Sequence, residues 1–208
     1  MTIIYLMRHS RGNLERNYIN TNESFQIENE KYILSVEGER KAKKYSKLEE
    51  LKDINMVVSS NYVRAMSTAK YIAHINNIPL YIDDNFNERK FGVDNIKKIP
   101  NNYFKRQMDD EEYKLENGES RQEVHKRMLK GLAHVLKNNI NKKAVIVSHA
   151  SSIAFLLTKW CNVEMINSKY VIKYKGKVLL NGFDSPELLK LEFNDKHRLV
   201  NISCIKPK

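Results

Sequence analysis

The chain has 208 residues, of which 41% are hydrophobic and 29% charged, and this size and composition favour one globular domain with a substantial core. Its 36 basic and 25 acidic residues give a net charge of +11, which suits anionic partners, but no basic motif interleaved with aromatic residues occurs, so nucleic acid is disfavoured as a partner. Two cysteines far apart argue against a disulfide framework and favour the reducing cytoplasm, and we expect neither secretion nor membrane insertion because no leader-like segment or apolar run of spanning length is present.

The first part of the chain alternates between strands and helices. A strand is predicted at residues 2–7, where β-branched and aromatic residues precede small and polar ones. Residues 14–33 lack periodicity and are expected to form a surface loop. Apolar spacing predicts a helix from an N-cap at Ser35 to about residue 51. A strand at 54–59 then leads into a helix through residue 73, for which Ser59, Ser60 and Asn61 are candidate caps.

The middle of the chain contains an insert after a short strand at residues 79–82. Residues 93–117 show no decisive periodicity, and either a lid or specificity segment or a solvated helical excursion fits them. Ser120 and Glu123 have the spacing of a capping box, and an apolar face continues to Leu136, which predicts a helix.

The last part of the chain is predicted to contain a buried strand at residues 143–148, a helix from about Ser151 to Trp160, and several further strands. Those strands are predicted at 171–174, 177–180, 188–193 and 199–205, with a hairpin turn at 194–197. The alternation of strands and helices indicates a three-layer α/β/α sandwich with a mainly parallel central sheet. Because no linker or repeat divides residues 1–208, we expect a single domain.

Groups suited to binding phosphate follow or begin several of these elements. Arg8 and His9 end the first strand, Arg64 lies in the first turns of a helix, Glu88 follows a short strand, and His149 lies at a strand-to-helix turn. Each has a purely structural alternative, such as an ion pair of Glu88 with a neighbouring basic residue. Because the carboxyl ends of parallel strands form the ligand-binding edge of an open α/β sheet, their joint occurrence favours an anion site.

Six short motifs follow one another along most of the chain. They are Leu6-Met7-Arg8-His9, Leu34-Ser35-x-x-Gly38, Ser59-Ser60-x-x-x-Arg64-Ala65-x-x-Thr68-Ala69, Asn87-Glu88-Arg89-x-Phe91-Gly92, Gly118-Glu119-Ser120 and Val147-Ser148-His149. In this order they make the chain resemble the histidine phosphatase superfamily, which has the phosphoglycerate mutase-like fold.

The resemblance implies a role for each candidate residue. His9 corresponds to the nucleophile and Glu88 to the proton donor, whereas Arg8, Arg64 and His149 form the phosphate pocket. Phosphoryl transfer spreads negative charge over three oxygens, which two guanidiniums and an imidazole stabilise. His9 must attack through a neutral nitrogen, so its other ring nitrogen is expected to donate to a carbonyl. We expect no metal or other cofactor, because the arginines supply the positive charge.

Three positions depart from the family pattern. Where the family usually has Gly, then Ser or Thr, then Asn, this chain has Ser10, Gly12 and Glu15. Asn13 or Asn17 is a candidate substitute for the missing amide.

The expected activity is that of a histidine acid phosphatase-like phosphoric monoester hydrolase acting on a small phosphorylated substrate through a phosphohistidine on His9. A phosphoglycerate mutase-type transferase shares this chemistry and is the first alternative; the shortness of the insert favours hydrolysis. The second alternative is a non-catalytic module that binds a phosphorylated ligand or RNA, and the complete set of five residues argues against it.

Overall fold

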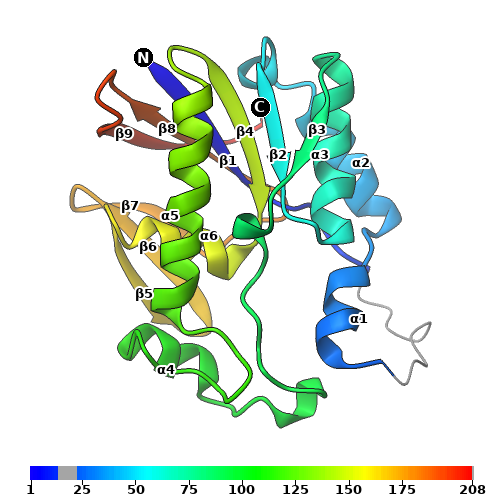
Figure 1. The fold of residues 1–208 in the computed structure, drawn as a ribbon, viewed down its shortest axis with the longest axis vertical. Coiled ribbons are helices and arrows are strands. Elements are labelled where there is room, and N and C mark those ends of the chain that lie inside the picture. Colours follow the sequence, from blue (N-terminus) through cyan, green and yellow to red (C-terminus); the bar gives the residue numbers. More distant parts are fainter. Residues whose placement is uncertain (14–22, 208) are drawn as a thin grey trace.

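A six-stranded sheet with strand order β3-β2-β4-β1-β8-β9 forms the centre of the protein in the computed structural model, which describes residues 1–13 and 23–207 (Figure 1). The strands β1, β2, β3 and β4 are parallel, and they span Thr2–Arg8, Met56–Ser59, Leu80–Ile82 and Lys143–Ser148. Two strands continue the sheet in antiparallel fashion, β8 (Glu187–Phe193) beside β1 and β9 (Leu199–Ile205) at the edge. The mainly parallel sheet predicted from the sequence is confirmed.

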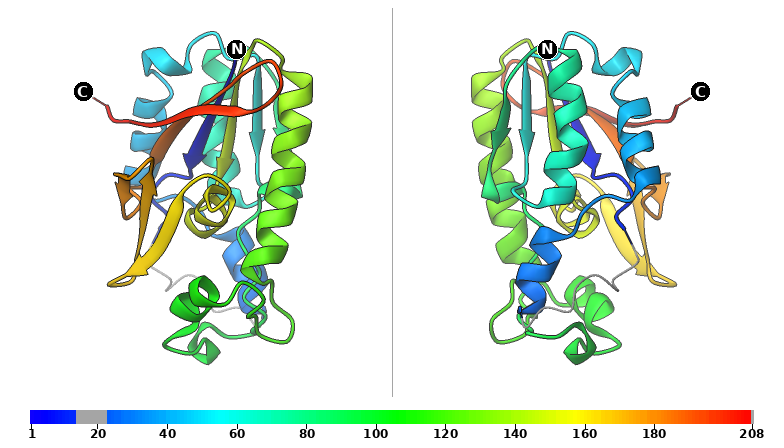
Figure 2. Two further views of the ribbon diagram at one scale, coloured as in Figure 1. Left: turned by 90° about the vertical axis from the view of Figure 1, so that its left-hand side faces the viewer. Right: turned by 90° about the vertical axis from the view of Figure 1, so that its right-hand side faces the viewer.

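Helices cover both faces of this sheet, which confirms the three-layer sandwich (Figure 2). On one face lie α2 (Val36–Tyr45) and α3 (Val63–Ile75), and on the other lie α5 (Arg121–Asn138) and α6 (Ala150–Leu157). Strand β1 shows why two cores form. Its side chains alternate, so that Tyr5 and Met7 join the buried cluster that includes α3, whereas Ile4 and Leu6 join the cluster that includes α5 and α6.

A second, three-stranded antiparallel sheet follows α6. It has the order β5-β6-β7 and consists of Asn162–Ile166, Lys169–Tyr174 and Lys177–Asn181. The sequence did not predict β5, whose side chains are all at least partly exposed and give no run of buried positions. Tyr170 and Leu180 pack against the α5–α6 core, so this sheet is joined to the central one through shared apolar contacts.

Two short helices lie beyond the carboxyl ends of the parallel strands (Figure 1). They are α1 (Phe25–Lys31) and α4 (Tyr103–Asp109), each seven residues long. The predicted loop at 14–33 is therefore wrong for the α1 segment, and residues 14–22 lie outside the described part of the chain. Two helical turns are too short to give a clear period. Aromatic contacts hold both helices, because the Phe91 ring lies 5.4 Å from that of Phe25 and 5.9 Å from that of Tyr103.

Capping explains where the helices begin. Ser35 accepts a hydrogen bond from the Gly38 amide at the start of α2, as predicted, and both halves of the predicted Ser120–Glu123 capping box are present at the start of α5. Helix α3 begins later than predicted, after Tyr62, since the Ser59 hydroxyl donates to the Ser60 carbonyl and the Ser60 hydroxyl contacts His149 and the Tyr62 amide, which precedes the helix.

Two helices end earlier than predicted. Helix α2 stops at Tyr45, followed by a separate 3₁₀ turn at Glu49–Leu51, and α6 stops at Leu157. Further 3₁₀ turns occur at Asp84–Phe86 and Ile96–Lys98. Within residues 1–13 and 23–207, no helix combines the length and apolar character needed to cross a membrane.

Candidate active site

The predicted residues meet at the carboxyl ends of β1, β2 and β4, which are neighbours in the sheet. Arg8 is the last residue of β1, and the amide of the next residue, His9, donates to the Ser148 carbonyl of β4 at 2.9 Å. The Ser60 amide, after β2, donates to the Val147 carbonyl at 3.0 Å. These hydrogen bonds continue the strand pairing into the turns that follow the strands. The buried sheet therefore fixes the backbone positions of the site residues.

The imidazole of His9 has one partner at each ring nitrogen. Nδ1 lies 2.7 Å from the Ser10 carbonyl oxygen, which only accepts, so Nδ1 carries the proton. Arg64 donates its Nε–H to Nε2 at 3.1 Å, which therefore presents a lone pair. Burial, together with the charges of Arg64 and Arg8, lowers the pKa of His9 well below its ordinary value of 6.5. His9 is thus held neutral, with Nε2 facing the positive side of the site.

Arg64 extends from the first turn of α3 and is only 5% exposed. Its guanidinium also donates to the Asn29 carbonyl of α1 and lies 5.0 Å from the centre of the Tyr62 ring. Burial lowers the pKa of Arg64 to about 10, which leaves the group charged at neutral pH. Arg64 therefore brings a fixed positive charge to Nε2 of His9.

Arg8 is fixed from the other side of the site by a loop near the end of the chain. Its Nη1 donates to the Phe183 carbonyl at 2.8 Å and to the Asp184 carbonyl at 3.2 Å. Both partners are backbone groups, which fix the direction of the guanidinium without neutralising its charge.

His149 is fully buried, and its ring centre lies 5.1 Å from that of His9. Its Nε2 is 2.7 Å from the Ser60 hydroxyl oxygen, which already accepts from the Tyr62 amide at 3.2 Å. Because the Ser60 hydroxyl makes no other hydrogen bond within the described residues that could take its proton, we assign it as donor to Nε2, which places the proton of His149 on Nδ1. Nδ1 is buried and has no hydrogen-bond partner among the described residues. Ser60 was predicted only as a helix cap, because nothing local in the sequence relates it to His149.

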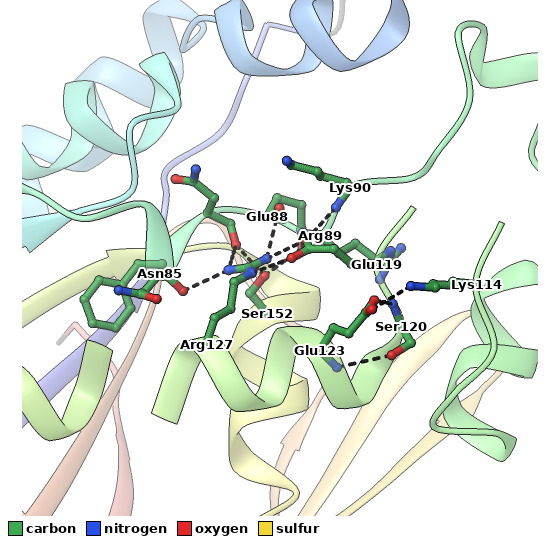
Figure 3. A network of polar contacts seen from close by, with 12 residues as sticks. Asn85, Glu88, Arg89, Lys90, Lys114, Glu119, Ser120, Glu123, Arg127 and Ser152 are labelled. Carbon is green, nitrogen blue, oxygen red and sulfur yellow. Dashed lines mark hydrogen bonds and ion pairs between the residues drawn. The ribbon is translucent and has the colours of Figure 1, made fainter. Parts of the chain in front are cut away.

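Glu88 lies in a backbone segment that Arg127 of α5 holds in place (Figure 3). Nη1 of Arg127 donates to the carbonyls of Asn85 and Asn87 at 2.8 Å each, and Nη2 donates to that of Glu88 at 3.3 Å. Glu119 receives two further bonds from Arg127, at 2.8 and 3.0 Å, and its carboxylate also accepts from the backbone amide of Lys90. Sequence reasoning missed Arg127, whose acceptors are carbonyls about 40 residues away.

The carboxylate of Glu88 has two hydrogen-bonding groups beside it. Its Oε1 accepts from the Arg89 amide at 3.0 Å and lies 3.1 Å from the Ser152 hydroxyl, whose single proton is shared with the Asn87 carbonyl at 2.8 Å (Figure 3). The Arg89 side chain is almost fully buried and donates to the Tyr170 hydroxyl at 3.2 Å, with its guanidinium 4.7 Å from the centres of the Phe91 and Phe104 rings. The Arg89 side chain therefore packs against the Phe91 and Phe104 rings. The alternative in which Glu88 only balances the charge of Arg89 is not supported.

A cavity of about 340 Å³ opens onto these groups. It contains four of the five predicted residues and a wall from α1 and its C-terminal end, and its described lining is Arg8, His9, Phe25, Glu28, Asn29, Tyr32, Arg64 and Glu88. None of residues 93–117 belongs to this lining. The insert instead contributes Phe104 to a neighbouring cavity of about 520 Å³, which also reaches Arg8.

The departures from the family pattern are coupled to the surrounding structure. A Cβ atom on Gly12 would lie 2.2 Å from the Tyr32 ring, so a side chain at this position would displace that ring. Ser10 is buried, and its hydroxyl donates to the Gly38 carbonyl at 2.7 Å. The backbone amide of Asn13 donates to the Ile33 carbonyl. The other two positions, 15 and 17, lie outside the described residues.

Comparison with known proteins decides the family. A model of the histidine phosphatase superfamily (branch 1) matches residues 4–180. The chain belongs to this superfamily. The described parts of the chain contain no group of three or more His, Cys, Asp or Glu side chains placed to hold a metal ion.

The proteins that are similar to this chain include phosphatases. An uncharacterized phosphatase, PhoE, of Bacillus subtilis (strain 168) is 30% identical over 177 residues, which are 72% of this chain and 85% of that protein. A mycobacterial glucosyl-3-phosphoglycerate phosphatase structure aligns with a TM-score of 0.70 at 17% identity, covering 97% of this chain and 96% of that one. A phosphoserine phosphatase variant of Entamoeba histolytica aligns with a TM-score of 0.64 at 18% identity, covering 98% and 97%. At these identities, the solved structures show the fold.

Proposed function

We propose that this protein is a metal-independent, histidine acid phosphatase-like phosphoric monoester hydrolase that acts on a small phosphomonoester through a phosphohistidine on His9. The observation that carries the proposal is the state of His9, whose Nδ1 proton is held by the Ser10 carbonyl, whose Nε2 carries the lone pair, and which lines the same cavity as Arg8, Arg64 and Glu88. Membership in the superfamily supports the reaction class.

In the first step, the Arg64 Nε–H shifts from Nε2 of His9 to a phosphoryl oxygen, and the freed lone pair of Nε2 forms the N–P bond as the bond from phosphorus to the alcohol oxygen breaks. The electron pair leaves with that oxygen, which takes a proton from Glu88. The positive charge that develops on the ring is shared with the Ser10 carbonyl through the Nδ1–H bond. Arg8, Arg64 and Nδ1–H of His149 would bind the phosphoryl oxygens, whose charge is greatest in the transition state.

In the second step, water attacks phosphorus and the N–P bond breaks. Glu88, now a carboxylate, takes the water proton, and inorganic phosphate is released. The bond from the Arg89 amide to Oε1, with the Ser152 hydroxyl beside the same oxygen, orients the carboxylate through both steps. His9 returns to its neutral form.

Hydrolysis is preferred over the mutase reaction because the relative found by sequence bears the name of a phosphatase and the insert at 93–117 is short. We propose that this insert acts as a specificity segment through Phe104, which lines the cavity next to Arg8. We further propose that residues 1–208 form one domain, since β8 and β9 complete the sheet begun by β1, and that this domain works in the cytoplasm with both cysteines reduced.

The test is phosphate release from p-nitrophenyl phosphate and from a panel of sugar, nucleotide and glycerate phosphates. Phosphate on the protein that is labile in acid and stable in base is measured in parallel. We expect turnover and this phosphoenzyme in the parent protein, both lost in His9→Ala and both retained in His134→Ala, which changes an exposed histidine on α5. EDTA should leave the rate unchanged.

Three results would contradict the proposal. Isomerisation of 3-phosphoglycerate that outpaces phosphate release with a bisphosphate primer would establish the mutase reaction. Inactivation by EDTA that one divalent metal reverses would overturn the metal-free mechanism. RNA binding with steep salt dependence and no phosphate release from any monoester would favour the binding module.

A further inference from the structure

The loop at residues 183–186 fixes both residues of the Arg8–His9 pair. The carbonyls of Phe183 and Asp184 accept from Nη1 of Arg8, and the Ser185 hydroxyl donates to the His9 carbonyl at 2.9 Å. One loop therefore sets the direction of the Arg8 guanidinium and anchors the backbone of the adjacent histidine.

This loop is itself attached to Glu187, the first residue of β8. Oε2 of Glu187 accepts from the Asp184 amide at 3.0 Å, and the Glu187 side chain is 1% exposed. Glu187 also pairs with Arg8 in the β1–β8 register. A buried carboxylate thus stands directly behind the loop that holds Arg8.

Lys206, after β9, neutralises this carboxylate. Its Nζ lies 2.9 Å from Oε1 and 3.1 Å from Oε2 of Glu187, and 2.9 Å from Oδ2 of Asp184. The Cys204 thiol donates to Oε1 at 3.1 Å. Because a buried carboxylate without a counter-ion is costly, Lys206 stabilises the Glu187 carboxylate and, through it, the bond from the Asp184 amide.

We infer that Lys206 and Glu187 are positioning residues for phosphate binding, which act through the 183–186 loop to hold the Arg8 guanidinium in its working direction. The inference rests on the proposed function, because it assigns Arg8 to the phosphoryl group. Glu187 and Lys206 lie outside the part of the chain that matches the superfamily model, since that match ends at residue 180.

The arrangement has a specific mechanical consequence. Nη1 of Arg8 is committed to two carbonyls, so the remaining guanidinium N–H groups are the ones available for an anion. The direction of these N–H groups is set by the 183–186 loop, which holds Nη1. If Lys206 is removed, the buried Glu187 carboxylate loses its charged partner, and its bond to the Asp184 amide is no longer fixed from that side. A misplacement of about 1 Å in a phosphate-binding group is enough to lower turnover roughly 100-fold.

Two variants remove the Lys206–Glu187 ion pair, and a third tests whether a positive charge alone is enough. Lys206→Ala removes the lysine without changing the loop sequence, whereas Lys206→Arg keeps a positive charge at the same position. Glu187→Leu combined with Lys206→Met replaces the ion pair by apolar side chains, an exchange that proteins often tolerate without loss of stability. Lys190→Ala is the matched control, because Lys190 belongs to another ion pair of β8, with Glu192 at 2.8 Å.

We expect Lys206→Ala and the double variant to lower kcat/KM for p-nitrophenyl phosphate roughly 10- to 100-fold and to raise the inhibition constant of inorganic phosphate. Lys206→Arg should restore both values, and Lys190→Ala should change neither. Thermal unfolding of each variant is measured alongside. The inference is wrong if the double variant folds and keeps kcat/KM within about twofold of the parent.

A double-mutant cycle with Arg8→Ala separates positioning from a merely structural effect. If Lys206 acts through Arg8, adding Lys206→Ala to Arg8→Ala changes kcat/KM by less than about twofold. An equal loss in both backgrounds would refute the inference while leaving the phosphatase intact. If the parent itself releases no phosphate, the proposed function fails. The positioning role of Lys206 and Glu187 is then tested by calorimetric measurement of inorganic phosphate binding to the same variants. An unchanged affinity in Lys206→Ala and in the double variant would overturn it.

Discussion

Arg64 and His9 face each other across 3.1 Å, with the guanidinium Nε–H donated to Nε2 of the imidazole. The contact requires a neutral ring, because a protonated His9 would place two cations against each other at hydrogen-bond distance. The Nδ1 bond to the Ser10 carbonyl and the burial of the ring act in the same direction. The charge state of the proposed nucleophile is therefore built into the folded structure.

Replacing Arg64 tests the value of this charge. We expect Arg64→Gln to lower kcat roughly 100- to 1000-fold, the usual effect of removing one donor to a developing anion. Arg64→Lys should recover only part of the loss, because an ammonium does not reproduce the fork that reaches both His9 and the Asn29 carbonyl. Arg40→Gln, in an exposed position on α2, is the control. Similar rates for Arg64→Gln and Arg40→Gln would remove Arg64 from the site.

The depressed pKa of His9 predicts how stability depends on pH. In the unfolded chain His9 takes up a proton as the pH falls through 6.5, whereas the folded protein resists this until a lower pH. The unfolded state then binds more protons, so the free energy of unfolding should decrease below pH 6.5 and be insensitive to this group above it. His149, whose pKa is lowered in the same way, adds to the effect.

Urea unfolding at about pH 8 and about pH 5 measures this dependence. Relative to the parent, His9→Gln should lose less stability on acidification, and His134→Gln, at an exposed position, should behave like the parent. The same pH dependence in all three proteins would show that His9 titrates normally in the folded state.

Arg127 gives a test of the proposed role of Glu88. Arg127→Ala frees the carbonyls of residues 85, 87 and 88, so the carboxylate of Glu88 should lose its fixed direction. A general acid matters most when the leaving group is a poor one. We therefore expect kcat to fall roughly 10- to 100-fold with an alkyl phosphate and much less with p-nitrophenyl phosphate. Lys130→Ala, at an exposed position near Arg127 on α5, should change neither rate. An equal loss on both substrates would assign Arg127 a purely structural role.

Glu28 of α1 lines the same cavity as Arg8 and Arg64, which places a carboxylate beside the proposed phosphate site. We expect it to disfavour substrates whose alcohol portion is negatively charged. Glu28→Gln should raise kcat/KM for 3-phosphoglycerate relative to glycerol 3-phosphate roughly fivefold, the effect of about 1 kcal/mol between charges separated by water. Glu30→Gln, on the same helix but outside the lining of this cavity, is the control. An unchanged ratio in Glu28→Gln would show that α1 does not select substrates by charge.

The central sheet and the strand-end residues were predictable because each local signal is strong. An apolar run before Arg8 and His9, and another before His149, gives both the strand and the place where it ends. The capping box of α5 was predictable for the same reason, since its two side chains interact within one turn.

The supporting residues were not predictable because their partners are distant in the chain. Arg127 binds backbone carbonyls about 40 residues away, which leave no mark in the sequence because every residue has one, and its ion pair with Glu119 spans eight positions across a loop and a helix start. Ser60 looks like an ordinary helix cap until His149 is placed beside it. Helix α1 is short, and the contacts that place it in the site, such as Phe25 with Phe91 and the Asn29 carbonyl with Arg64, join residues far apart in the chain.

The site is divided between elements of different kinds. Arg8, His9 and His149 end or follow buried strands of the central sheet, whereas Phe25, Glu28 and Tyr32 belong to a short peripheral helix and its C-terminal end. Substitutions in that helix leave the sheet core untouched, so natural variation there can alter which alcohol is accepted while the reacting groups stay in place. Enzymes that share this layout can therefore diverge in substrate without re-evolving their chemistry.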